Sequence, residues 1–165
     1  MSDTVLPAEV VALARRVVEE NAAAGRTIAL AESCTGGLVA AALTEIPGSS
    51  AVLDRGFVTY SNESKRETLD VPEDIIDTFG AVSVACVYAM AQGALERSNA
   101  DVAVAISGVA GPDGGSEAKP VGTVVFARAV RGSDKPDAES KLFDDKDRGG
   151  VRLQATLCAL ELLLP

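Results

Sequence analysis

The sequence predicts an α/β fold, a layered sandwich in which helices pack against a mixed β-sheet. Helical and strand patterns alternate along the chain, which is the order that gives parallel strands joined by helices. The strand candidates are short and rich in β-branched residues, and the last ones follow one another without a helix, which indicates some antiparallel pairing. With 165 residues and no internal repeat or linker, residues 1–165 are expected to form a single domain.

The predicted elements follow from apolar spacing and from the residues that begin and end each pattern. In order they are a helix over residues 7–24, a strand over 27–31, a helix over 38–44, a strand over 56–60, a helix beginning at 61 or 62, helices over 72–79 and 83–98, strands over 102–106 and 123–129, an edge strand over 139–143, and a helix over 151–164. Pro7 suits a first helical turn, Gly25 and Gly80 suit helix ends, and Ser83 suits an N-cap.

Composition limits the classes of function. The net charge of −9 and the pI near 4.5 oppose nucleic-acid binding, which depends on lysine and arginine displacing counterions, so a small molecule is the expected partner. Three widely spaced cysteines fit reduced thiols, and neither a signal peptide nor a membrane-spanning run is recognisable. We therefore expect a cytoplasmic protein that binds neither nucleic acid nor membrane.

The absence of histidine restricts the available chemistry further. Nucleophile systems built on Ser-His-Asp or Cys-His, and imidazole-rich zinc or iron sites, cannot be assembled from these residues. No metal and no cofactor are expected. If the chain is a hydrolase, its proton must move through lysine, tyrosine or a carboxylate, which makes Ser/Lys catalysis the leading hypothesis.

Two glycine-rich segments are candidates for ligand binding. The segment Glu32 to Gly37 places hydroxyls and free amides at a strand-to-helix turn, where they could hold an anion, although a simple capping turn explains the same residues equally well. The segment Ser107 to Gly122 lacks the dinucleotide fingerprint and the P-loop pattern, so it is either a functional loop or a structural Ω-type loop.

Lys65 can be interpreted in two ways from the residues alone. On a helix, Ser61 and Lys65 share one face at a spacing of i, i+4, but Ser61 is better placed as a helix cap than as a nucleophile. A single lysine is most often solvated, and the local pattern favours that interpretation over a catalytic one.

Several motifs taken together resemble the CinA C-terminal domain family. They are residues 31–37, residues 47–50, residues 55–62, Lys65 and residues 107–123, and the resemblance extends over nearly the whole chain. It implies a three-layer α/β/α sandwich whose mixed sheet is largely parallel. It also implies hydrolysis of the carboxamide of nicotinamide mononucleotide, giving nicotinic acid mononucleotide and ammonia in pyridine nucleotide recycling.

The same resemblance implies roles for particular residues. Ser50 is expected to be the nucleophile, Lys65 its base and Tyr60 an assisting hydroxyl. The residues expected to bind substrate are Ser33, Thr35, Gly36, Gly37, Asn62, Ser107, Gly108 and Arg148. The alternative is a non-catalytic nucleotide-binding or regulatory module in which Lys65 contacts phosphate. The apolar C-terminal helix could serve a homo-oligomer interface as easily as the core.

Overall fold

The computed structural model describes residues 3–165, which form one five-stranded mixed sheet with helices on both faces. Across the sheet the strands lie in the order β2 (Leu53–Val58), β1 (Ile28–Glu32), β3 (Val102–Gly108), β4 (Thr123–Val130) and β5 (Ala138–Leu142). Strand β1 pairs in parallel with both β2 and β3, whereas β4 is antiparallel to β3 and to β5. The predicted α/β class and mixed sheet are confirmed.

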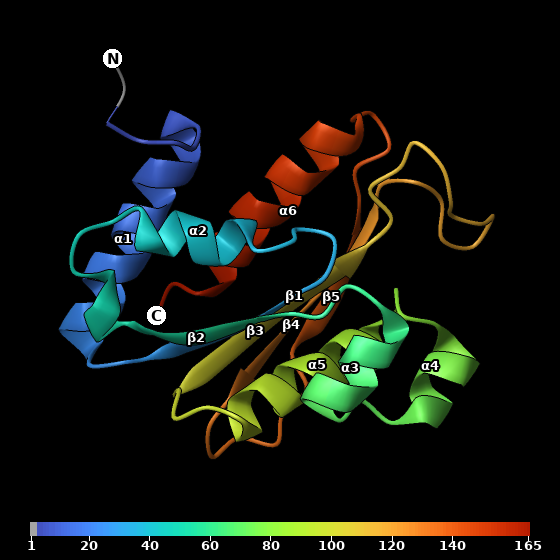
Figure 1. Ribbon diagram of the computed structural model, residues 1–165, viewed down its shortest axis with the longest axis horizontal. Helices are drawn as coiled ribbons and strands as arrows, with labels where there is room; N and C mark the ends of the chain where they lie inside the picture. The colour runs from blue at the N-terminus through green and yellow to red at the C-terminus, as the bar shows by residue number, and fades with distance from the viewer. Residues whose placement is uncertain (1–2) are drawn as a thin grey trace.

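The helices divide into two layers, one on each face of the sheet (Figure 1). One layer holds α1 (Ala8–Ala24), α2 (Leu38–Thr44) and α6 (Arg148–Leu162), and the other holds α3 (Asn62–Leu69), α4 (Glu73–Phe79) and α5 (Val84–Glu96). Side chains along β1 alternate between the two cores, with Ile28 and Leu30 in the first and Ala29 and Ala31 in the second. This period of two explains why the strand reads as a continuous apolar run.

Helix boundaries agree with the capping residues. Gly25 ends α1 with φ of 64°, and the Ser83 hydroxyl accepts from Cys86 N at the start of α5. Helix α6 begins at Arg148, earlier than predicted, because the Asp147 carboxylate caps it by accepting from Gly150 N at 2.8 Å.

The apolar C-terminal residues belong mostly to the core. Leu160 and Leu163 are fully buried, and Leu157, Leu162 and Leu164 pack against the same cluster. No helix among the described residues is long and apolar enough to span a membrane.

Strand β2 differs from its predicted range of 56–60, since it begins at Leu53 and ends at Val58. Beyond Val58, Thr59 N still donates to Glu32 O of β1, but the carbonyl oxygens of Thr59 and Tyr60 accept hydrogen bonds from Lys65 Nζ instead of from a strand. Because β1, β2 and β3 are parallel, their carboxyl ends meet at one edge, where the strand order reverses. Such an edge is the usual ligand site of an open α/β sheet.

Candidate active site

A cavity of about 230 Å³ lies at the carboxyl ends of the parallel strands. It is lined by Ser33, Cys34, Tyr60, Asn62, Lys65, Ala81, Val82, Ser107, Gly108, Ala110 and Arg148. Ser33 follows β1, Tyr60 follows β2, and Ser107 and Gly108 end β3, so three neighbouring strands each deliver polar groups to the same space. Helices α3 and α6 supply the two cationic side chains.

Lys65 is buried in the floor of this cavity. The Ser61 hydroxyl caps α3 by accepting from Ser64 N at 3.1 Å, which fixes the helix turn that carries the lysine. The Lys65 side chain is only 1% exposed, so the solvated interpretation is wrong. Its Nζ atom donates to Thr59 O at 2.8 Å, to Tyr60 O at 3.0 Å and to Ser33 Oγ at 3.0 Å.

These three acceptors are not equivalent. The carbonyl oxygens of Thr59 and Tyr60 can only accept, so each requires an N–H of Lys65 in either protonation state of the amine. When Lys65 is neutral it keeps two N–H groups, and its lone pair then faces the third partner, Ser33 Oγ. The geometry therefore orients neutral Lys65 to accept the proton of Ser33.

Burial is the main influence on the charge of Lys65. It lowers the pKa of the ammonium below its ordinary value, because the charged form loses hydration in the protein interior. Two buried thiols, Cys86 and Cys34, act weakly in the opposite direction. No carboxylate among the described residues forms an ion pair with Lys65. The site therefore favours the neutral amine that a general base requires.

Ser33 begins a tight turn between β1 and α2. Its amide donates to Ile106 O at 2.9 Å, which anchors the turn to β3. Within residues 3–165, the amides of Cys34 and Thr35 donate to no backbone acceptor of another residue. A free amide directly after a nucleophile at a strand-to-helix turn is the usual oxyanion donor in α/β hydrolases. The Cys34 thiol itself is nearly buried, and burial raises its pKa to about 11, so it is not a reactive thiolate.

The structure gathers most of the expected substrate-binding residues around this pair. Ser107 is 2% exposed, and Tyr60 and Asn62 lie at the exposed rim. Arg148 begins α6 and donates from Nη1 to Gly111 O at 2.6 Å, which holds its guanidinium beside the loop that follows β3. The cavity that contains Lys65 is therefore also lined by Ser107, Gly108 and Arg148.

The structure does not bring Ser50, the expected nucleophile, to Lys65. Ser50 is exposed, and it lines a different cavity together with Thr27, Asp54 and Asn99 at the amino end of β1. A strand rises about 3.3 Å per residue, which separates Thr27 from Ser33 by roughly 20 Å. Ser50 therefore cannot contact Lys65, and the hydroxyl that does so belongs to Ser33.

Three residues of the glycine-rich turn do not reach the cavity either. Thr35 is fully buried, and its hydroxyl donates to Glu32 Oε1 at 2.7 Å, so it is not available to substrate. Gly36 faces the Arg152 guanidinium, and Gly37 begins α2 beside Val58 with φ of 103°. These glycines allow the sharp turn, because their positive φ values strain any other residue.

The sequence analysis missed Cys34, Ala81, Val82 and Ala110 as lining residues. Small apolar side chains give no local signal of a cavity wall. It also assigned no role to Glu32, a carboxylate that is 1% exposed at the end of β1. A charged residue closing an apolar strand pattern is a signal that could have singled it out.

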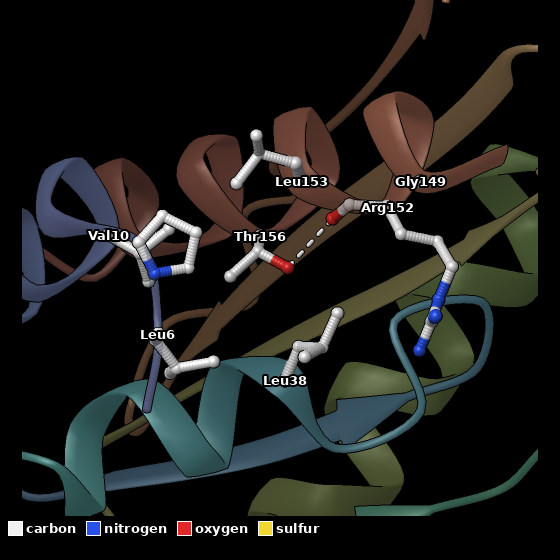
Figure 2. Close-up of a pocket in the computed structure, with 8 residues that line it drawn as sticks. Leu6, Val10, Leu38, Gly149, Arg152, Leu153 and Thr156 are labelled. Atoms are coloured by element: carbon white, nitrogen blue, oxygen red, sulfur yellow. Dashed lines mark hydrogen bonds between the residues drawn. The ribbon is translucent and has the colours of Figure 1, made fainter. Parts of the chain in front are cut away.

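A second cavity, of about 260 Å³, lies on the other side of the same turn (Figure 2). Apolar side chains of the N-terminal segment, α1, α2 and α6 line it, among them Leu6, Leu38 and Leu153. Figure 2 shows Arg152 extending from α6 past this cavity toward the loop before α2, where its Nε donates to Cys34 O at 3.1 Å. No hydroxyl of the described residues lining this cavity is hydrogen-bonded to an amine, in contrast to Ser33 and Lys65 in the first cavity.

Among residues 3–165, no group of three or more cysteine, aspartate or glutamate side chains is arranged to hold a metal ion. The only buried side-chain oxygen or nitrogen without a hydrogen-bond partner in that range is Thr59 Oγ1.

Comparison with known proteins agrees with this architecture. A family model described as the CinA C-terminal domain matches residues 10–165. The chain is 50% identical over 155 residues to the nicotinamide-nucleotide amidohydrolase PncC of Escherichia coli strain K12, and the match covers 94% of this chain and 93% of that protein. The crystal structure of the competence/damage inducible protein CihA from Agrobacterium tumefaciens superimposes with a TM-score of 0.93 at 48% identity, covering 99% of this chain and 97% of that one.

Other relatives are longer. A CinA-like protein of Akkermansia muciniphila is 52% identical over 136 residues, which are 82% of this chain and 32% of that protein. The chain thus spans about a third of the length of such relatives.

Proposed function

The chain belongs to the CinA C-terminal domain family, and on that premise we propose that it is a nicotinamide-nucleotide amidohydrolase. It converts nicotinamide mononucleotide and water to nicotinic acid mononucleotide and ammonia, in cytoplasmic pyridine nucleotide recycling. The relatives named nicotinamide-nucleotide amidohydrolase PncC support this activity, because the chain aligns with them over most of both lengths. The observation that carries the proposal is the hydrogen bond between Lys65 Nζ and Ser33 Oγ inside the cavity.

Acylation begins when the substrate carboxamide lies against Ser33. As Oγ attacks the carboxamide carbon, its proton passes to the lone pair of neutral Lys65 Nζ. The carbonyls of Thr59 and Tyr60 accept from Lys65 before and after this transfer, so the amine does not need to reorient. The new ammonium is held by the acceptors already present.

The negative charge of the tetrahedral intermediate requires donors that are fixed in advance. The amide of Cys34 is suited to this role because it follows the nucleophile directly and donates to no backbone acceptor among the described residues. Arg152 restrains the next peptide unit by donating to Cys34 O. Backbone donors fixed in this way need no rearrangement when the charge develops.

Collapse of the intermediate breaks the carbon–nitrogen bond. The Lys65 ammonium returns its proton to the departing nitrogen, which leaves as ammonia, and an ester remains on Ser33. Water then attacks this ester while neutral Lys65 takes its proton. Collapse of the second intermediate releases the carboxylic acid, which ionises by losing its proton to solvent, and Ser33 Oγ recovers the proton from Lys65.

The remaining cavity residues suit the rest of the substrate. Arg148 is the cation at the opening, and we assign it to the 5′-phosphate. Asn62 and Ser107 can hydrogen-bond to the ribose or the carboxamide. Gly108 lets the backbone of β3 approach β4 closely, since a Cβ there would lie 2.9 Å from Thr123 O. We assign the Tyr60 hydroxyl to assist protonation of ammonia at the cavity rim.

Ammonia release from nicotinamide mononucleotide by the purified chain tests the proposal. We expect one ammonia and one nicotinic acid mononucleotide per substrate consumed. With hydroxylamine present, the Ser33 ester should be intercepted and the corresponding hydroxamate should form. Binding of the nucleotide without ammonia release would instead support a non-catalytic binding module.

A further inference from the structure

Glu32 is a buried carboxylate that the proposed reaction does not use. It forms no ion pair among the described residues, although it is 1% exposed. Three donors satisfy it instead: Thr35 Oγ1 at 2.7 Å and Val39 N at 2.9 Å bond to Oε1, and Ala40 N at 3.1 Å bonds to Oε2. A carboxyl group in the interior is costly to retain even when its oxygens are hydrogen-bonded, so this arrangement calls for a reason beyond packing.

These hydrogen bonds enclose the turn that carries Ser33. The carboxylate of Glu32 joins the residue directly before Ser33 to the middle of the turn at Thr35 and to the first amides of α2. The amides at the start of a helix lack partners within the helix, and a carboxylate both satisfies them and matches the helix dipole. The side chain of Glu32 therefore links the residue before the turn to the start of the helix that follows it.

The main chain of Glu32 also reaches the segment that holds the base. Its carbonyl oxygen accepts from Thr59 N at 2.9 Å, and Thr59 O in turn accepts from Lys65 Nζ. Glu32 thus connects the nucleophile turn with the carbonyls that orient Lys65. A displacement of about 1 Å between reacting groups can lower a rate by about 100-fold.

We propose that Glu32 and Thr35 form a positioning pair that fixes the Ser33 turn, keeping Ser33 Oγ on Lys65 Nζ and the Cys34 amide on the developing oxyanion. This inference rests on the proposed amidohydrolase function. Thr35 acts through Glu32 rather than on the substrate, since its side chain is fully buried and lines no part of the cavity.

The carboxylate is better suited to this role than an amide. Its two oxygens only accept, as three donors require, whereas glutamine would present an NH₂ group to at least one of them. Burial dominates the pKa of Lys65, and Glu32 is not among the groups that raise it.

The test compares Glu32→Gln, Thr35→Val and Thr35→Ser in steady-state ammonia release. We expect kcat to fall by about 100-fold in Glu32→Gln and by about tenfold in Thr35→Val, with KM changed by less than about threefold. Thr35→Ser keeps the hydroxyl and should restore kcat to within about twofold of the original. If Glu32→Gln does not fold, the two Thr35 variants decide the outcome.

Thr156→Val is the matched control for the loss of a buried threonine hydroxyl. Thr156 is 2% exposed, and its hydroxyl donates to Arg152 O at 2.8 Å within α6 and not to Glu32 (Figure 2). Its kcat should stay within about twofold of the original. A full kcat in Thr35→Val would overturn the positioning role, and a raised KM at unchanged kcat would restore the substrate-binding one.

A measurement independent of activity separates this inference from the proposed function. Hydrogen exchange of the Val39 and Ala40 amides, followed by NMR, should be at least about tenfold faster in Glu32→Gln than in the original chain. Unchanged exchange rates of these two amides would refute the positioning role of Glu32 even if the enzyme is active. Conversely, an original chain that releases no ammonia refutes the proposed function, whatever the exchange shows.

Discussion

The sharpest test of the site compares alanine variants of two serines: Ser50, which the sequence analysis predicted as nucleophile, and Ser33, which contacts Lys65. Ser33→Ala removes the hydroxyl that bonds to Lys65, and with it the covalent route. Loss of one member of such a catalytic unit costs on the order of 10⁴ to 10⁶ in kcat, which corresponds to about 5.5 to 8 kcal/mol of transition-state stabilisation. Ser50→Ala removes an exposed hydroxyl roughly 20 Å away and should leave kcat within about twofold.

Both variants are measured by ammonia release from nicotinamide mononucleotide over a range of substrate concentrations, with circular dichroism to confirm folding. Ser33→Ala should still bind the nucleotide, because the other cavity residues remain. Hydroxamate formation in hydroxylamine should disappear in Ser33→Ala and persist in Ser50→Ala. Normal turnover by Ser33→Ala, or a folded but inactive Ser50→Ala, would refute the assignment.

Further predictions concern the base, metal independence and one buried hydroxyl. Because burial lowers the pKa of Lys65 and the neutral amine is the active form, kcat/KM should rise with pH through an apparent pKa below the ordinary lysine value; a flat profile would contradict this. Lys65→Arg, which stays charged, should lose at least about 10³-fold in kcat while folded, and substantial turnover would exclude Lys65 as the base. The absence of histidine leads us to expect that EDTA will not change the rate, whereas loss restored by a divalent cation would reveal a missed metal site. Thr59→Val removes an unpaired buried hydroxyl, so urea titration should show a free energy of unfolding that is unchanged or raised by up to about 1 kcal/mol; a clear loss would indicate a hidden partner.

The lowered pKa of Lys65 also determines how this residue's contribution to stability changes with pH. A lysine whose pKa is lower in the folded state binds fewer protons there than in the unfolded chain between the two pKa values. Its contribution is therefore most favourable above the unfolded pKa and is lost as pH falls through the lowered folded pKa. Catalysis and stability thus favour the same neutral form.

Local sequence signals were sufficient for most of the fold. Apolar spacing located α1 and α5, and Gly25, Ser61 and Ser83 occupy the terminal positions that their side chains favour. Strand β2 was displaced because the carbonyls of Thr59 and Tyr60 bond to a lysine side chain instead of a neighbouring strand. No pattern within the strand itself contains that information.

The active site was only partly determined by sequence. The absence of histidine made Ser/Lys catalysis the leading hypothesis, and only the family resemblance implied a role for Lys65; Ser33, Ser50 and Ser61 were all available as hydroxyls. Ser33 and Lys65 lie 32 residues apart, and they meet only because parallel β1 and β2 end at the same sheet edge. Burial of Lys65, which makes a neutral base accessible, also arises from packing between separate elements. The sequence by itself determined which chemistry was available, through residue types and local periodicity. Only the tertiary structure decided which hydroxyl lies against Lys65, because strand pairing and burial depend on contacts between segments distant in the chain.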